Sequence, residues 1–350
     1  ALNFKVNNQK AGQITSDGSV FMGYQAGNTN NGSSNTGIGV NALYSNTEGN
    51  ENIATGADAL YSNTTGSYNT ATGVNALFSN TQGYYNTAIG GAALFSNSTG
   101  HSNVANGFQT LYSNTEGYYN IADGAFSLFY NTTGNYNTAL GVTALYSNVA
   151  GSNATAIGYN AMRYSNNTAT AFDNYNVAVG YEALRGSPNP VNNTGNYNTA
   201  LGYQALISNS SGNFNTANGY TALYSNTTGL FNTAAGNAAL FYNTTGIFNT
   251  ATGINALHNN TDGGSNTANG GNALFYNTSG GQNTATGYQA LWSNITGYYN
   301  TAMGYDALRE NLDNHNTATG YQALRNNTMG WQNTAVGSNS LVSNTTGSYN

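Results

Sequence analysis

A 17-residue repeat runs through almost all of this 350-residue chain. Residues 69–85 and 86–102 align without a gap, and the shared frame reads N-T-A-x-G-x-x-A-L-x-S-N-T-T-G-x-Y, with Asn69 and Asn86 at position 1. About nineteen copies of this unit fill residues 21–350. Because a repeat of fixed period indicates units that pack only on their neighbours, this feature predicts a solenoid and limits the fold more than any other.

The frame is lengthened at two places. The glycine at position 5 recurs at a spacing of 17 residues, with one spacing of 16 from Gly304 to Gly320, but the spacing is 22 from Gly158 to Gly180 and again from Gly180 to Gly202. Both five-residue insertions lie in the same half of the repeat, at about residues 163–175 and 185–197. Insertions into one part of a repeat map to loops, so we expect a loop at each place.

The first twenty residues do not follow the repeat. Residues 1–20 are therefore predicted to form an N-terminal strand or cap, and residues 21–350 form the repeat array. The sequence Ser16-Asp17-Gly18 within this first segment has the residue types of a tight turn.

A single repeat is too short for a helical hairpin, and its recurring glycine and asparagine disfavour helices. We expect two short extended pieces, N-T-A-x-G and x-A-L-x-S, separated by turns. Leu77 and its equivalents at position 9 are the predicted core. The constant Ala and Gly at positions 3 and 5 indicate a close approach of another layer or chain, and the variable position 4 is predicted to face solvent. Asparagines and aromatic rings should stack as columns. The predicted fold is an all-β parallel β-solenoid or β-roll of about nineteen 17-residue coils.

One such coil cannot fold alone. Burying its leucine contributes roughly 1.5–3 kcal/mol, whereas ordering the backbone costs about 1–2 kcal/mol per residue. Neighbouring coils must supply the rest of the stabilisation, and the thin apolar column favours several chains sharing it, most simply as a homotrimer. The chain stops in frame to begin another coil, so head-to-tail filaments are the alternative assembly.

Composition excludes several classes of function. Only 5% of residues are charged, against about 25% in ordinary proteins, and the net charge is −6. Such a chain lacks the clustered Lys and Arg that nucleic-acid phosphates require. It contains no cysteine, which excludes disulfides and cysteine zinc sites. No apolar run approaches the length of about 20 residues that a membrane span needs.

The motif N-T-A-I-G at residues 86–90, followed by A-L-F-S-N at 93–97, resembles the head repeats of trimeric autotransporter adhesins. The longer form G-Y-Q-A-L, at residues 202–206, 287–291 and 320–324, resembles repeat arrays of bacterial and phage tail-fibre-domain proteins. The opening at residues 4–12 is similar to the segment that precedes such arrays. This resemblance implies a left-handed β-roll, trimerisation and a fibrous or adhesive role.

Residues that could perform chemistry are scattered. His101, His258 and His315 stand in different coils at different repeat positions, without the spacing of metal ligands. The carboxylates are dispersed, and no nucleophile motif is present. We therefore expect no catalysis, no metal and no cofactor.

Binding residues are the remaining candidates. Arginines flank both insertions and the only two prolines lie in the second one, while tryptophans and exposed tyrosines could stack on sugar rings. The alternative is that the aromatic rings pack on one another or between chains. The candidate contact residues are Arg163, Arg185, Pro188, Pro190, Trp292 and Trp331.

The repeated N-T-T-G turn also creates N-x-S/T sequons, which predict possible glycosylation sites. They stand at Asn63, Asn97, Asn131, Asn226, Asn243, Asn277, Asn294 and Asn344.

These observations favour a structural subunit of an extracellular fibre or filament, a rigid spacer with an adhesive surface. The first alternative is a glycan-binding adhesin or a tail fibre on a virion. The second is an ice-binding solenoid, although Val104 and Ile121 interrupt the threonines of position 2. The expected partners are further copies of the chain and cell-surface glycans, at the cell surface or outside the cell.

Overall fold

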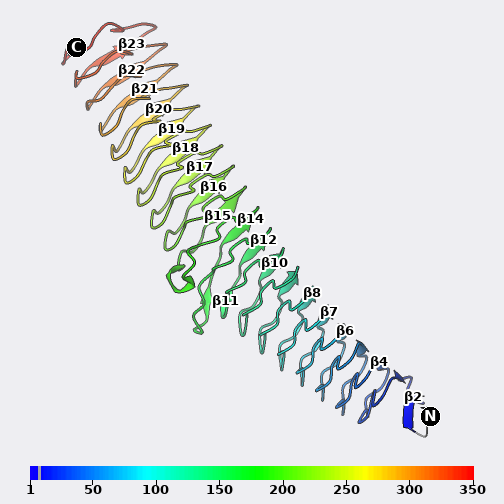
Figure 1. Ribbon diagram of the computed structural model, residues 1–350. Helices are drawn as coiled ribbons and strands as arrows, with labels where there is room; N and C mark the ends of the chain where they lie inside the picture. The colour runs from blue at the N-terminus through cyan, green and yellow to red at the C-terminus, as the bar shows by residue number, and fades with distance from the viewer. Residues whose placement is uncertain (7–8) are drawn as a thin grey trace. The chain divides into compact units, whose positions relative to one another are not determined.

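The computed structural model describes residues 1–6 and 9–350 and confirms an all-β parallel β-solenoid of about nineteen coils. The chain divides into two compact units, Ala1–Tyr175 (unit 1) and Asn176–Asn350 (unit 2). In Figure 1, the strands of each unit follow one another in chain order, one to a coil. No helix in the described part of the chain is long and apolar enough to cross a membrane.

Each coil contains one three-residue strand at positions 2–4 of the repeat. In unit 1 these are β3 (Val20–Met22), β4 (Thr36–Ile38), β5 (Ile53–Thr55), β6 (Thr70–Thr72), β7 (Thr87–Ile89), β8 (Val104–Asn106), β9 (Ile121–Asp123), β10 (Thr138–Leu140) and β12 (Thr155–Ile157). In unit 2 they are β14 (Val177–Val179), β15 (Thr199–Leu201), β16 (Thr216–Asn218), β17 (Thr233–Ala235), β18 (Thr250–Thr252), β19 (Thr267–Asn269), β20 (Thr284–Thr286), β21 (Thr301–Met303), β22 (Thr317–Thr319) and β23 (Thr334–Val336).

The strands stack in parallel with like residues in register. Ala71 of β6, for example, is the partner of Ala88 in β7, and Thr70 is the partner of Thr87. The alanine at position 3 points inward and is fully buried, whereas position 4 is exposed, as predicted. The period-2 alternation of a strand therefore places the threonine of position 2 on the same outward side as position 4.

The second predicted extended piece, x-A-L-x-S, is not a strand. Its residues form turns in every coil, because the residues at positions 7 and 9 adopt left-handed backbone conformations, as shown by Asn75 (φ 59°) and Leu77 (φ 51°). Such a conformation costs about 1–3 kcal/mol for a residue with a side chain. Full burial of Leu77 and the bond from its N–H to the Ala93 carbonyl oxygen (2.9 Å) offset that cost. Leucine is thus the core residue, as predicted, although it sits in a turn.

The glycine of position 5 is required by the close stacking of coils. Gly73 has φ +140°, and a Cβ placed on it would lie 2.6 Å from the carbonyl carbon of Gly90 in the next coil. The predicted close approach therefore exists. The approaching backbone belongs to the next coil of the same chain.

Two columns of buried asparagine side chains run through the coils. At position 12, Asn80 Nδ2 donates to Asn63 Oδ1 (2.8 Å) and to the Gly83 carbonyl oxygen (3.0 Å). At position 1, Asn69 Oδ1 accepts the backbone N–H of Asn86 (3.0 Å). The predicted amide ladders are confirmed, and they satisfy polar groups that would otherwise be costly to bury.

Aromatic rings at position 10 form stacked columns on the outside, as predicted. In unit 1 the column runs from Tyr44 to Tyr146, and its first two rings have centroids 4.9 Å apart and planes inclined by 4°. A second column at position 17 includes Tyr197 and Phe214, which are inclined by 6°. Stacking of this kind covers the faces of the rings and leaves mainly their edges exposed.

The N-terminal segment is built from antiparallel strands. Strand β1 (Leu2–Val6) pairs with β2 (Gln9–Ile14), and β2 pairs with β3 of the first coil. The predicted turn is present: the Thr15 N–H donates to the Ser19 carbonyl oxygen (2.9 Å), and Gly18 has φ +86°.

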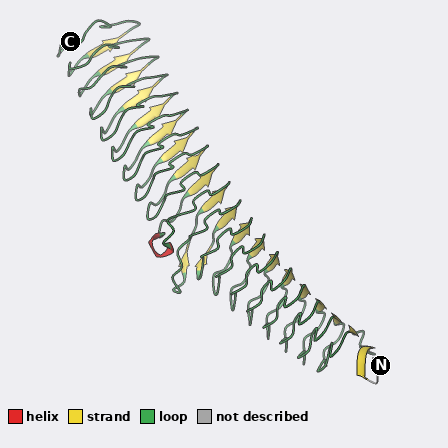
Figure 2. Cartoon of the chain, in the orientation of Figure 1, coloured by secondary structure: helices red, strands yellow, loops and turns green. Residues whose placement is uncertain are grey.

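The two insertions fold differently. In unit 1 the inserted residues include β13 (Phe172–Asp173), which pairs in parallel with β11 (Gly151–Ser152), so part of this predicted loop is a short strand. In unit 2 the insertion contains a 3₁₀ turn, η1 (Pro190–Asn192), which is the only helical element of the described residues (Figure 2). Pro190 occupies its first position, where proline fits without losing a hydrogen bond.

Candidate functional site: a hollow at the second insertion

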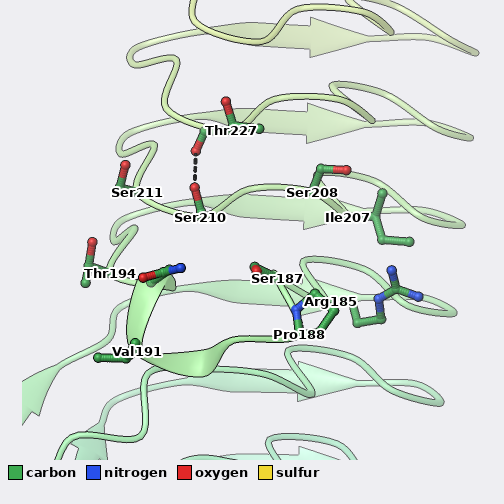
Figure 3. Close-up of a pocket in the computed structure, with 12 residues that line it drawn as sticks. Arg185, Ser187, Pro188, Val191, Thr194, Ile207, Ser208, Ser210, Ser211 and Thr227 are labelled. Atoms are coloured by element: carbon green, nitrogen blue, oxygen red, sulfur yellow. Dashed lines mark hydrogen bonds between the residues drawn. The ribbon is translucent and has the colours of Figure 1, made fainter.

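The second insertion opens a hollow of about 680 Å³ on the side of unit 2. One wall is the inserted loop and the other is formed by the two coils that follow, as Figure 3 shows. The lining residues are Arg185, Gly186, Ser187, Pro188, Val191, Asn192, Thr194, Ile207, Ser208, Ser210, Ser211 and Thr227.

A side-chain clamp holds the loop in shape. Asn193 accepts the backbone N–H of Ser187 (2.9 Å) through Oδ1 and donates to the Ser187 carbonyl oxygen (2.8 Å) through Nδ2. The amide of Asn193 lies against Gly186, where a Cβ would be 2.8 Å from Nδ2, and Gly186 has φ +83°. The clamp joins Ser187 to Asn193 within the insertion, so the loop between them is closed at the rim of the hollow.

The lining of the hollow is rich in hydroxyl groups. Ser187 lies on the loop, and Ser208, Ser210 and Ser211 lie on the coil opposite, with Ser210 Oγ donating to the Thr227 carbonyl oxygen (3.0 Å). Pro188, Val191 and Ile207 add apolar surface. Such a mixture suits a ligand that has both hydroxyl groups and apolar faces.

The charge of Arg185 is balanced within the solenoid. Its Nη1 lies 3.0 Å from Glu182 Oε1, and Glu182 Oε2 accepts from Gln204 Nε2 (2.8 Å). The Nε of Arg185 is buried and has no hydrogen-bond acceptor among the described residues. The hollow therefore carries one arginine at its edge without a strong net charge.

Arg163, Trp292 and Trp331, which were also predicted as contact residues, do not line the hollow. Arg163 belongs to unit 1, where its guanidinium lies over the rings of Tyr146 (5.6 Å) and Tyr164 (5.2 Å). Trp292 lies in the position-10 column of unit 2 with the guanidinium of Arg309 over its ring (4.9 Å).

Trp331 stands at repeat position 16, where it meets Tyr349 edge to face, with centroids 4.6 Å apart. Of the predicted residues, only Arg185 and Pro188 line the hollow, while Pro190 begins the adjacent 3₁₀ turn. For the stacked columns, the alternative that aromatic rings pack on one another is confirmed.

Burial in the folded chain disfavours N-glycosylation at seven of the eight predicted sequons. Their asparagines are fully buried and belong to the amide column of position 12, where each Nδ2 donates to the glycine carbonyl three residues on. A glycan on this nitrogen would break the ladder and would have no space. The buried residues are Asn63, Asn97, Asn131, Asn226, Asn243, Asn277 and Asn294. Asn344, in the last coil, is only half-buried.

The histidines are packed into aromatic columns. His101 stacks on Tyr84 (4.7 Å), and His258 stacks between Phe241 and Phe275. Burial lowers the pKa of His258 below the usual histidine value, because the charged imidazolium is poorly solvated there. Across residues 1–6 and 9–350, no three His, Cys, Asp or Glu side chains come together as metal ligands.

One electrostatic feature was missed from sequence. Where an arginine replaces the aromatic ring of position 10, an acid can occupy position 7 of the same coil, as in Asp306 and Arg309 (3.8 Å). Arg325 of the next coil also reaches Asp306 (3.3 Å). The spacing of three residues between the acid and the arginine could have predicted this ion pair from the sequence. The serines of the hollow gave no such signal because they are ordinary repeat residues.

A scan against models of known protein families finds no match, and no curated protein matches the chain either. The similarity to tail-fibre and adhesin repeats therefore rests on the short motifs alone.

Proposed function

We propose that this chain is a structural segment of an extracellular fibre, in which the stacked coils serve as a rigid spacer. The observation that carries the proposal is the continuity of coil-to-coil bonding. Strands, amide columns and aromatic columns all repeat from coil to coil, so each added coil extends the solenoid without needing a new kind of core.

An in-frame deletion tests the spacer. Removing residues 216–266 deletes three coils and leaves Asn215 joined to Thr267 in the normal repeat frame. We expect a folded protein whose longest dimension in small-angle X-ray scattering is shorter by about 14 Å, because coils stack at about 4.8 Å. Deleting residues 216–223 breaks the frame and should reduce the ordered β content. A folded in-frame variant of unchanged length would reject the spacer.

Assembly from several copies and an external location belong to the same proposal. The position-17 column of unit 2 supports self-association, because its aromatic residues remain 44–54% exposed at Tyr197, Phe214, Phe231 and Phe248. Sedimentation of the intact chain at rising concentration tests association, and a monomer throughout would reject it. Antibody labelling of unbroken cells tests location, and labelling only after lysis would reject an external fibre.

Glycan recognition at the hollow is the second candidate, favoured by its hydroxyl-rich lining beside Pro188 and Val191. Deleting residues 188–192 restores the 17-residue spacing, so the coil can close while the hollow is lost. We expect a glycan array to lose the signals of the intact protein. The matched deletion of residues 166–170 in the other insertion should preserve them. Identical array profiles for all three proteins would reject this site.

A further inference from the structure

A second concave surface lies along unit 2, and it begins at Ser225 in the coil that also contributes Thr227 to the hollow. We name it the axial groove; it has a volume of about 450 Å³ and is lined by residues at positions 11 and 13 of successive coils. The lining residues are Ser225, Tyr242, Thr244, Asn259, Thr261, Tyr276, Thr278 and Ile295. A further hollow of about 360 Å³ shares Tyr276 and Ile295, continues to Thr328 and includes one acidic residue, Glu310.

The two tyrosines of the groove are oriented unlike the stacked rings of the columns. Tyr242 is inclined by 76° to Phe241 and by 83° to His258, which are themselves stacked. Tyr276 is inclined by 85° to Phe275 and by 79° to Trp292. The plane of each tyrosine ring is therefore roughly perpendicular to the planes of the neighbouring stacked rings.

These two rings are also accessible. Tyr242 is 47% exposed and Tyr276 is 42% exposed, and both line the groove. Within residues 1–6 and 9–350, the ring contacts of both tyrosines are edge-type, so no stacked ring covers either one as the column rings cover one another. The groove therefore offers aromatic surface to a ligand.

Threonines supply hydrogen-bond acceptors between these rings. The hydroxyl groups of Thr244 and Thr278 each donate to a backbone carbonyl oxygen of the next coil, at 3.0 and 3.1 Å. The Thr261 hydroxyl has two acceptors in reach, Asp262 Oδ1 (3.0 Å) and the Thr278 carbonyl oxygen (3.2 Å). Because each hydroxyl proton is already engaged, the oxygen can still accept a hydrogen bond from outside.

The residues that line the groove are uncharged and recur with the repeat, and one carboxylate, that of Asp262, borders them beside Thr261. None of its eight lining residues is acidic or basic, although the chain carries a net charge of −6. Tyr242 and Tyr276 stand two coils apart, so their rings repeat along the axis at about 9.6 Å. An occupant with the same character is an uncharged polymer whose rings have apolar faces and whose edges carry hydroxyl groups.

We propose that the axial groove binds a neutral polysaccharide lying along the solenoid axis, with sugar rings packed on Tyr242 and Tyr276 and sugar hydroxyls donating to the threonines. This site shares no lining residue with the hollow at the second insertion, although the two adjoin in one coil. Whether the groove binds a polysaccharide does not depend on whether the solenoid serves as a rigid spacer.

Affinity electrophoresis of the intact chain tests the proposal. The gels contain soluble neutral polysaccharides (xyloglucan, mixed-linkage β-glucan, galactomannan or dextran) or the charged polymers alginate and dextran sulfate. We expect retardation by at least one neutral polymer. Tyr242→Ala and Tyr276→Ala should each weaken that binding about tenfold, consistent with loss of one aromatic contact.

Three variants serve as controls. Tyr288→Ala removes an equally exposed tyrosine that stacks on Tyr305 outside the groove, and it should change binding less than about twofold. Tyr276→Phe keeps the ring and should retain most of the affinity. The deletion of residues 188–192 should leave this binding unchanged, which separates the groove from the hollow.

Tryptophan fluorescence gives a second readout. The ring centroid of Trp292 lies 4.6 Å from that of Tyr276, so ligand binding in a Trp331→Phe background should alter the emission. Absence of retardation by every neutral polymer, retardation by the charged polymers only, or equal losses in Tyr288→Ala and Tyr276→Ala would each overturn the proposal. Loss of self-association in Tyr242→Ala would instead assign the groove to a second copy.

Discussion

Units 1 and 2 share the same interior and differ on their outer columns. Both bury alanine at position 3, leucine at position 9 and asparagine at positions 1 and 12. On the outside, the threonine column of position 2 is unbroken from Thr199 to Thr334 in unit 2, whereas Ile53, Val104 and Ile121 interrupt it in unit 1. The insertion of unit 1 forms a paired strand, and that of unit 2 forms a hollow.

This difference shows where the repeat tolerates change. An inward residue contacts its equivalents in the coils before and after it, so one substitution disturbs three coils. An outward residue can vary freely unless a column or groove uses it. Functional differences between the units are therefore expected on the outside, while changes to the interior should have equal effects in both.

The largest effect is expected from the glycine of position 5. Gly73→Ala in unit 1 and Gly253→Ala in unit 2 each place a Cβ within 2.8 Å of backbone atoms in the next coil, at φ +140° and +126°. Overpacking costs about 1–3 kcal/mol, and the strained backbone costs about 1–3 kcal/mol more. Guanidinium denaturation should show that both variants lose a similar amount of unfolding free energy.

Gly337→Ala is the matched control, because Gly337 has φ +118° but no atom within 4 Å of an added Cβ. It should show only the backbone cost of about 1–3 kcal/mol. Equal destabilisation by all three substitutions would show that the clash between the added Cβ and the next coil contributes nothing to the loss of stability.

A smaller effect is expected on the pH dependence of stability, and it arises from His258 in unit 2. Because burial lowers the pKa of His258 in the folded state, the unfolded chain binds this proton more readily. The stabilising contribution is complete above the ordinary histidine pKa and is lost as the pH falls through the lower, folded value. The denaturation midpoint should therefore fall more on acidification in the native protein than in His258→Phe. If the denaturation midpoints of the two proteins fell equally with pH, the lowered pKa of His258 would be contradicted.

The smallest effect concerns ice. The unbroken threonine column of unit 2 is exposed, but its neighbours at position 4 vary from Leu201 and Asn218 to Met303. We therefore expect no thermal hysteresis from the intact chain, nor from a variant in which Ile53, Val104 and Ile121 are all changed to Thr. Hysteresis that rises in this variant would revive the ice-binding alternative.

Much of the fold could be predicted because stacking places identical residues over one another. The repeat frame alone indicated the leucine core, the amide ladders and the aromatic columns, since each requires only that coils lie in register. The same reasoning left two interpretations open for the sequons. Asn63 and its equivalents satisfied both the ladder and the sequon pattern, and only the structure shows that they are buried in the ladder.

The residue pattern alone specifies the coil, because small, apolar and amide positions recur at a period that only stacked β-coils satisfy. Tertiary structure decided how each coil closes: Leu77 occupies a left-handed turn because a short coil must reverse direction while keeping its core residue inside. It also decided where the surface is concave. The hollow beside Ser187 and the groove between Tyr242 and Tyr276 depend on how residues of neighbouring coils are spaced and turned, which no single repeat contains.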